Sequence, residues 1–139
     1  MKLLEMKNKL AIDAAKVIFE NQINTVFVGG TALNLFYIYY RYSEDLDLAF
    51  ENKETKYEIA DFLKKQGYAV ERTDVNFRYT LTLDGTTIKL DLLDYKEYYN
   101  GIEIKLFEGV NFKTLKIEEF ICGKIISFLT REEINGIGR

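Results

Sequence analysis

The sequence contains no histidine, no proline and no tryptophan, and its only cysteine is Cys122. Without histidine, the chain has no histidine general base and no Ser-His-Asp triad. A single cysteine excludes an intrachain disulfide and a cysteine-based zinc site. No apolar run reaches the ~18 residues that indicate a membrane-spanning helix. Without proline, helices and strands must be interrupted by the nine glycines and by Asn and Asp.

The composition is ordinary for a globular domain. With 139 residues, 47% hydrophobic and 29% charged, the chain is expected to form one domain with a single core. Its net charge of −3 and pI of about 5.1 indicate no large basic surface, so tight non-specific nucleic-acid binding by this chain alone is not expected. Glu5 and Asp13 interrupt the N-terminal segment, which does not resemble a signal peptide. We therefore expect a cytoplasmic protein without membrane contact.

Hydrophobic periodicity predicts both helices and strands. Apolar stripes at helical spacing predict helices over residues 3–21, 53–66 and 117–130. Alternation predicts a strand over 102–107 and a hairpin over 75–93, in which Asp84-Gly85 is a two-residue type I′ turn. A further short strand is expected at 68–71, directly after the helix over 53–66.

The stretch from Val26 to Phe50 organises the rest of the chain. Val26–Val28 is a short apolar run, Gly29-Gly30 interrupts it, and a helix is expected from Thr31 to about Tyr40. Glycine allows an abrupt turn and a close approach of a ligand to the backbone. The free N–H groups at the start of a helix form an anion site, so this order predicts a phosphate cradle. Alone, such a pair of glycines is more often only a turn.

Residues 45–50, DLDLAF, alternate in the manner of a strand with one buried face. Asp45 and Asp47 then share the other face, with Cβ atoms roughly 6–7 Å apart. Two adjacent carboxylates are the oxygen ligands that Mg²⁺ accepts. An Asp-x-Asp strand alone is usually a solvated edge, but here it follows the phosphate cradle by one helix.

The sequence GGTAL at 29–33, followed by RxSxDLDL at 41–48, resembles the signature of the AbiE-type abortive-infection toxin nucleotidyltransferases. That family lies within the DNA polymerase β-like nucleotidyltransferase superfamily. The resemblance implies an α/β (α+β) fold in which helices flank a mixed β-sheet. It also implies an NTP substrate and Mg²⁺ or Mn²⁺ as cofactor.

The resemblance further implies a third acidic residue on a later strand and a lysine on the helix after it. Asp91, in IKLDLL, lies on the polar face of its strand, although such a charge also protects edge strands from aggregation. Asp94 is the second candidate, but it is expected on the opposite face. Lys124, in LKIEEFICGK, aligns with the family's lysine, and its alternative role is that of a surface lysine.

The implied site has two parts. We expect the carboxylates to converge on one polar face, and Asp91 to help accept the proton of the acceptor hydroxyl. The catalytic and metal-binding residues are Asp45, Asp47 and Asp91, and the nucleotide-binding residues are Gly29, Gly30, Thr31, Arg41, Ser43 and Lys124.

The resemblance implies transfer of a nucleotide from an NTP to an acceptor hydroxyl, on RNA or tRNA, by the toxin of a toxin–antitoxin or abortive-infection system with a cognate antitoxin. Two alternatives remain open: a small-molecule, antibiotic-type adenylyltransferase, and a non-catalytic nucleotide-binding module. Residues 1–139 are expected to be one catalytic domain that lacks the family's C-terminal helical part, in a trimmed or naturally short form. The expected lack of this helical part predicts an exposed apolar surface and self-association. The residues expected on that surface are Phe128, Leu129, Ile134 and Ile137.

Overall fold

The computed structural model of this chain describes residues 2–39, 42–95 and 101–122. The described residues form three helices, which alternate with the first strands, and seven strands, of which the last five follow one another; residues 117–122 begin a further helix. In chain order the elements are α1 (Leu3–Glu20), β1 (Val26–Val28), α2 (Gly29–Phe36), β2 (Asp45–Phe50), α3 (Lys53–Lys65), β3 (Ala69–Arg72), β4 (Arg78–Leu83), β5 (Thr86–Asp94), β6 (Ile102–Phe107) and β7 (Val110–Leu115).

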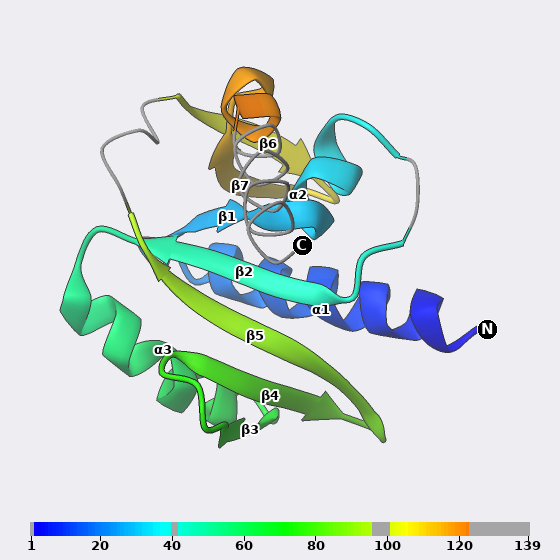
Figure 1. Ribbon diagram of the computed structural model, residues 1–139, viewed down its shortest axis with the longest axis vertical. Helices are drawn as coiled ribbons and strands as arrows, with labels where there is room; N and C mark the ends of the chain where they lie inside the picture. The colour runs from blue at the N-terminus through cyan, green and yellow to red at the C-terminus, as the bar shows by residue number, and fades with distance from the viewer. Residues whose placement is uncertain (1, 40–41, 96–100, 123–139) are drawn as a thin grey trace, which may run out of the picture.

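The strands form one mixed sheet in the order β3-β4-β5-β2-β1-β7-β6 (Figure 1). The pairs β2–β5 and β1–β7 are parallel, and the other neighbours are antiparallel. Strand β2 therefore lies at the centre, between β1, which leads into the two glycines, and β5, which carries Asp91. The predicted mixed sheet with flanking helices is confirmed.

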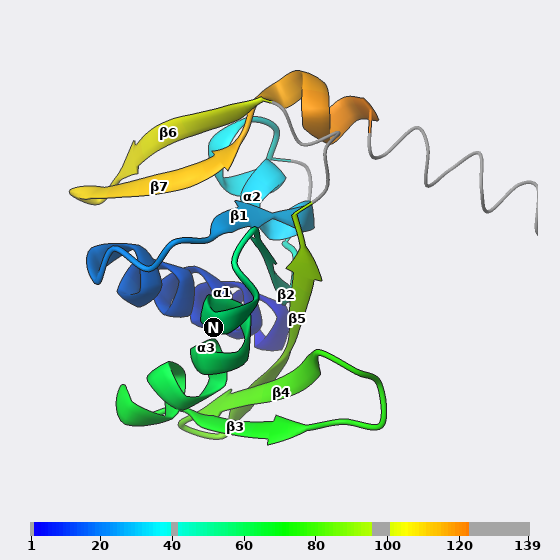
Figure 2. The same cartoon turned by 90° about the vertical axis from the view of Figure 1, so that its left-hand side faces the viewer.

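Helices α1 and α3 pack on the same side of β2 and β5 (Figure 2). The apolar positions of these strands, such as Leu46, Leu48 and Leu90, are fully buried against them. Because side chains alternate along a strand, the intervening residues of β2 and β5 lie on the opposite face. The hydrophobic core thus determines which face carries the aspartates.

Within the described residues, no helix has the length and apolar character needed to cross a membrane.

Helix α2 is shorter than expected and begins earlier. It starts at Gly29 and ends at Phe36 instead of continuing to about Tyr40. The Tyr37 hydroxyl donates a hydrogen bond to the Glu103 carboxylate of β6 or to the Leu115 carbonyl of β7, each 2.8 Å away. The segment contains no local helix breaker, so we attribute the end of α2 to this anchor on distant strands.

Strand β7 was not predicted. It follows Glu108 and Gly109, whose φ angles of 49° and 78° form the same kind of turn as Asp84 and Gly85, at 50° and 81°. An alternating segment, VNFKTL, then pairs with β6 and reaches β1. The helix predicted over 117–130 begins as expected, but its later part, with Lys124 and the apolar surface predicted at 128–137, lies outside the described residues.

Candidate active site

The three predicted carboxylates lie on neighbouring central strands. In the parallel pair β2–β5, Asp47 is directly level with Asp91, and Asp45 is level with Lys89 (Figure 1 shows the two strands side by side). Level residues on adjacent strands project to the same face. The structure therefore places Asp45, Asp47 and Asp91 on one face, opposite the side on which α1 packs.

The glycine turn lies directly against this carboxylate row. Val28 of β1 is level with Asp47, and Gly29 follows with a φ of +82°. A Cβ atom added to Gly29 would lie 2.8 Å from Asp47 Cγ and would overlap Oδ2. Only glycine suits this backbone conformation and this close approach. The start of α2 and the Asp47 carboxylate therefore form one continuous surface.

The remaining predicted nucleotide-binding residues differ in their surroundings. A Cβ atom at Gly30 would lie 3.2 Å from Ser43 Oγ, so Ser43 lies beside the glycine turn. Thr31 is buried, and its hydroxyl donates a hydrogen bond to the Asp45 carbonyl. Arg41, like Lys124, lies outside the described residues.

Burial and neighbouring charges raise the proton affinity of two of these carboxylates, Asp47 and Asp45. Burial, followed by the charges of Asp91 and Asp45, raises the pKa of Asp47 from 3.8 to about 7. Burial also raises the pKa of Asp45, whose Oδ1 atom is buried without a hydrogen-bond partner. A buried carboxylate oxygen without a donor is costly, and a cation relieves this cost. The donor chemistry therefore fits a divalent metal ion.

Asp91 is bound to an arginine that the sequence analysis did not select. Arg78, level with Asp91 on β4, donates through Nε to Asp91 Oδ1 at 2.8 Å and through Nη2 to Oδ2 at 3.4 Å. Among the described residues, no three Asp, Glu or Cys side chains are arranged as a ready metal site. The three aspartates share a face as predicted, but their carboxylates do not form the predicted convergent group, because Asp91 is directed to Arg78. The role of Asp91 as the third metal ligand stays a prediction.

Asp94 lies on the opposite face, as the alternation predicts. Its carboxylate pairs with Lys56 of α3 at 2.9 Å, and this ammonium also lies 3.6 Å from the centre of the Phe77 ring. Lys56 is buried, whereas the Asp94 side chain is largely exposed. Asp94 therefore anchors α3 to β5 and is separated from the other aspartates by the sheet.

Two cations beside the aspartates were missed, although a signal for them exists. Counting outward from the Asp84-Gly85 turn pairs Leu83 with Thr86 and, five steps later, Arg78 with Asp91. The same count places Thr80 level with Lys89. The polar face of β4 and β5 therefore presents Arg78 and Lys89 next to the carboxylate row, an arrangement that the turn type already implies.

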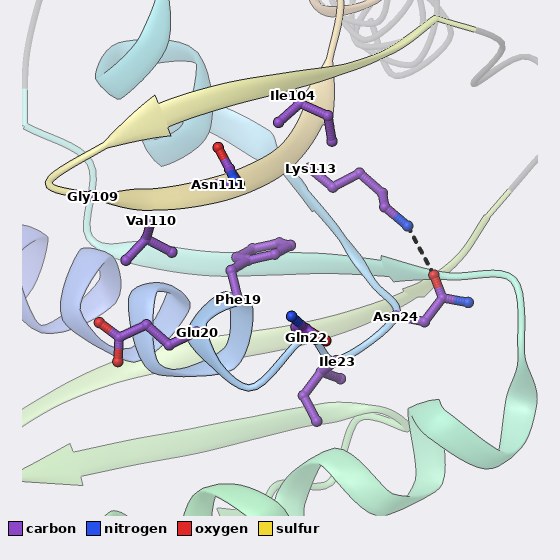
Figure 3. A pocket seen from close by; sticks show the side chains of 10 residues that line it. All are labelled: Phe19, Glu20, Gln22, Ile23, Asn24, Ile104, Gly109, Val110, Asn111 and Lys113. Carbon is purple, nitrogen blue, oxygen red and sulfur yellow. Dashed lines mark hydrogen bonds between the residues drawn. The ribbon is translucent and has the colours of Figure 1, made fainter.

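A cavity of about 500 Å³ lies elsewhere, between the end of α1 and the β6–β7 hairpin (Figure 3). Phe19 and Ile23 contribute apolar surface, and Lys113 Nζ donates a hydrogen bond to Asn24 Oδ1 at 3.0 Å. Among the described residues that line the cavity, Glu20 is the single carboxylate and none is a predicted site residue. The described lining therefore lacks the carboxylate row and the glycine turn expected of a phosphate-transfer site, although this cavity has a greater volume than the one beside Asp45.

A family profile matches most of the chain. Residues 12–138 match the family profile described as "Nucleotidyl transferase AbiEii toxin, Type IV TA system". No curated protein sequence matches the chain.

Several solved structures share the fold. MenT4, a nucleotidyltransferase toxin from Mycobacterium tuberculosis H37Rv, superposes with a TM-score of 0.69 at 17% identity, over 88% of this chain and 52% of its own. An antigenic nucleotidyltransferase-like protein from Paracoccidioides brasiliensis gives 0.60 at 18% identity, over 90% and 65%. JHP933 from Helicobacter pylori gives 0.52 at 24% identity, over 86% and 55%. This chain matches between about half and two thirds of each of these proteins.

Proposed function

The chain belongs to the AbiEii nucleotidyltransferase toxin family, and from this we propose that it transfers a nucleotidyl group from an NTP to an acceptor hydroxyl. The observation that carries the proposal is the β2–β5 register. It sets Asp47 level with Asp91 and places Asp45 on the same face, directly beside the start of α2. A phosphate cradle next to a row of carboxylates is what nucleotidyl transfer requires.

The triphosphate occupies the glycine side of the carboxylate row. The backbone N–H groups of Gly29, Gly30 and Thr31 begin α2 and have no partner within the helix, so they and the helix dipole favour the β- and γ-phosphates. Ser43 adds a hydroxyl beside Gly30. Arg41 and Lys124 are proposed to add positive charge.

Asp45, Asp47 and Asp91 would hold the metal ion. Enzymes of this kind generally use a divalent ion such as Mg²⁺ or Mn²⁺, which neutralises charge developing on the α-phosphoryl group and lowers the pKa of the acceptor hydroxyl. The unpartnered Oδ1 of Asp45 and the raised pKa of Asp47 support this assignment. Arg78 would release Asp91 or keep one of its oxygens oriented.

In the proposed reaction, the NTP lies on the glycine side of β2 and the acceptor on the β5 side. The acceptor oxygen forms a bond to the α-phosphorus, the bond from this phosphorus to the bridging oxygen breaks, and pyrophosphate leaves. We assign the acceptor proton to Asp91, because β5 lies on the side of β2 away from the glycine turn. Positioning and electrostatics supply most of the rate enhancement in such a transfer.

We propose an RNA acceptor, such as tRNA, and a cognate antitoxin encoded with the chain. The family description, a toxin of a type IV toxin–antitoxin system, supports the antitoxin. A library of RNAs with free 3′ hydroxyls and a set of small hydroxyl compounds would each be incubated with one α-labelled NTP at a time. Label found only on small compounds would favour the antibiotic-type alternative.

Variants of the carboxylate row test the site. Asp45→Asn and Asp47→Asn are each expected to lower pyrophosphate release by about 100-fold or more, since each removes charge stabilisation at the reacting phosphate. Asp61→Asn, an exposed carboxylate on α3, is the matched control and should leave the rate unchanged. Bound NTP without pyrophosphate release, in the parent chain and in all variants, would identify a non-catalytic binding module.

A further inference from the structure

A smaller cavity adjoins Asp45 on the side away from the glycine turn. It measures about 250 Å³, and its lining includes Asp45, Lys89, Thr80 and Lys7. Strands β5 and β4 supply Lys89 and Thr80, and they lie beyond β2 when viewed from β1 and the glycines. We define this cavity as the β5 pocket. If the triphosphate occupies the glycine side, the β5 pocket faces the acceptor.

The strand register brings a lysine to the edge of the carboxylate row. Lys89 is level with Asp45 on one neighbour and with Thr80 on the other, and all three side chains project to the same face. Adjacent strands lie about 4.8 Å apart, so the Lys89 side chain spans the space next to the Asp45 carboxylate. Lys7, from α1, and Glu44, the residue before β2, also line this pocket.

The charges around the β5 pocket are already partly paired. Arg78 holds Asp91, and Lys7 lies 3.7 Å from Glu44. Lys89 is exposed and makes no hydrogen bond or ion pair with the described part of the chain. With Asp45 and Asp47 assigned to the metal ion, Lys89 is the cation in the described lining of the pocket that has no ion-pair partner.

We propose that the β5 pocket binds the phosphodiester next to the reacting 3′ hydroxyl of a nucleic-acid acceptor, through the Lys89 ammonium and the Thr80 hydroxyl. This rests on the proposed nucleotidyl transfer. A phosphodiester matches an unpaired ammonium and a hydroxyl donor, whereas a polycationic acceptor such as an aminoglycoside would place its amines against Lys89. The contact is electrostatic and independent of base identity, so it selects the class of acceptor and not its sequence.

Lys89→Gln tests the proposal, with Lys53→Gln as control. Lys53 is an exposed lysine at the start of α3, and α3 packs on the other side of the sheet. The probe is a short fluorescent single-stranded RNA with a free 3′ hydroxyl, titrated by anisotropy at several salt concentrations. Lys89→Gln should weaken binding several-fold and reduce the slope of log K against log salt by about 0.7, the value for one phosphate contact on a single strand. Lys53→Gln should change neither quantity.

A second probe tests whether Lys89 binds the charged phosphodiester at the last linkage. The same RNA with a methylphosphonate at its last linkage lacks the proposed negative charge. The parent chain should bind it as weakly as Lys89→Gln binds the normal RNA, and combining both changes should cause no further loss. Independent, additive losses would overturn the proposal, as would an unchanged salt slope in Lys89→Gln or no RNA binding by the parent chain.

The two proposals fail differently. Lys89→Gln should bind Mg-NTP as tightly as the parent chain, because Lys89 lies across β2 from the glycine turn. If the parent chain releases pyrophosphate and Lys89 has no effect on RNA binding, only the acceptor pocket is wrong. If the parent chain neither binds nor consumes NTP, the proposed nucleotidyl transfer itself is wrong.

Discussion

Asp47 is expected to destabilise the metal-free protein, and Asp47→Asn should therefore stabilise it at neutral and alkaline pH. Burial and the neighbouring charges of Asp91 and Asp45 raise the pKa of Asp47 from 3.8 to about 7. Its carboxylate lies directly against the backbone of Gly29, at a distance where a Cβ atom would overlap it. Metal binding requires a charged Asp47 carboxylate at a position where the metal-free fold disfavours charge. Such a requirement is a common source of conflict between activity and stability.

The size of the effect follows from proton linkage. Below pH 3.8 both the folded and the unfolded chain hold the Asp47 proton. Between pH 3.8 and about 7 the unfolded chain releases the proton and the folded chain keeps it, so the free energy of unfolding falls by about 1.4 kcal/mol per pH unit. Above pH 7 the loss is complete, at an upper value of about 4 kcal/mol.

The assay is urea unfolding in EDTA at pH 5 and pH 8. Because asparagine does not titrate and has nearly the same size, the advantage of Asp47→Asn over the parent chain should grow by about 3 kcal/mol between these two values. Asp61→Asn, on the exposed side of α3, should show no such pH-dependent advantage. Adding Mg²⁺ at pH 8 should stabilise the parent chain more than the variant, since it binds the folded carboxylate row.

An Asp47→Asn variant whose relative stability is the same at pH 5 and pH 8 would refute the reasoning. It would mean that the Asp47 carboxylate is solvated or paired in the folded chain. A variant that is less stable than the parent at pH 8 in EDTA would show that the Asp47 charge contributes to the fold, and the assignment of a cation site at this carboxylate would lose its main energetic support.

Gly29→Ala should lower the free energy of unfolding, measured with urea, by ~1–3 kcal/mol, because alanine is forced to a positive φ. The variant should also lose NTP binding, because its Cβ atom overlaps the Asp47 carboxylate, and unchanged NTP affinity would contradict this. Arg78→Gln should lower kcat by roughly tenfold while KM for NTP stays constant, since Asp91 faces the acceptor, and Arg78→Lys should restore part of the rate; an equal rise in KM would place Asp91 on the nucleotide side. Asp94→Asn should leave pyrophosphate release unchanged and should lower only stability, because its partner Lys56 is buried on the far face; lost activity would reopen its candidacy as a metal ligand.

Local sequence patterns were sufficient to predict which residues share a face. Alternation in DLDLAF and IKLDLL separated Asp45, Asp47 and Asp91 from the buried leucines, and it placed Asp94 with the latter. The reason is physical: a strand has a period of two, and burial of one face leaves no other arrangement. The Asp84-Gly85 turn likewise determined the β4–β5 hairpin, because both residues adopt the positive φ that such a turn requires.

Elements whose limits depend on distant contacts were predicted less well. Helix α2 ends at Phe36 because Tyr37 is anchored to β6 and β7, which lie more than sixty residues later in the chain. Local propensity and periodicity do not contain this information, because tertiary packing supplies it. Strand β7 was missed for another reason: its residues alternate as those of the predicted strands do, but Glu108-Gly109 was not recognised as a hairpin turn.

The sequence by itself determined the chemical groups of the site and the face of the strand on which each lies. Only the tertiary structure decided that β2 and β5 are parallel neighbours and that Asp47 is level with Asp91. The place of Arg78 beside Asp91 follows from the hairpin register and was open to prediction from the sequence. Strand order is decided by long-range pairing between residues far apart in sequence, and many orders satisfy the same alternation. The parallel β2–β5 pair therefore turns three separate carboxylates into one candidate site.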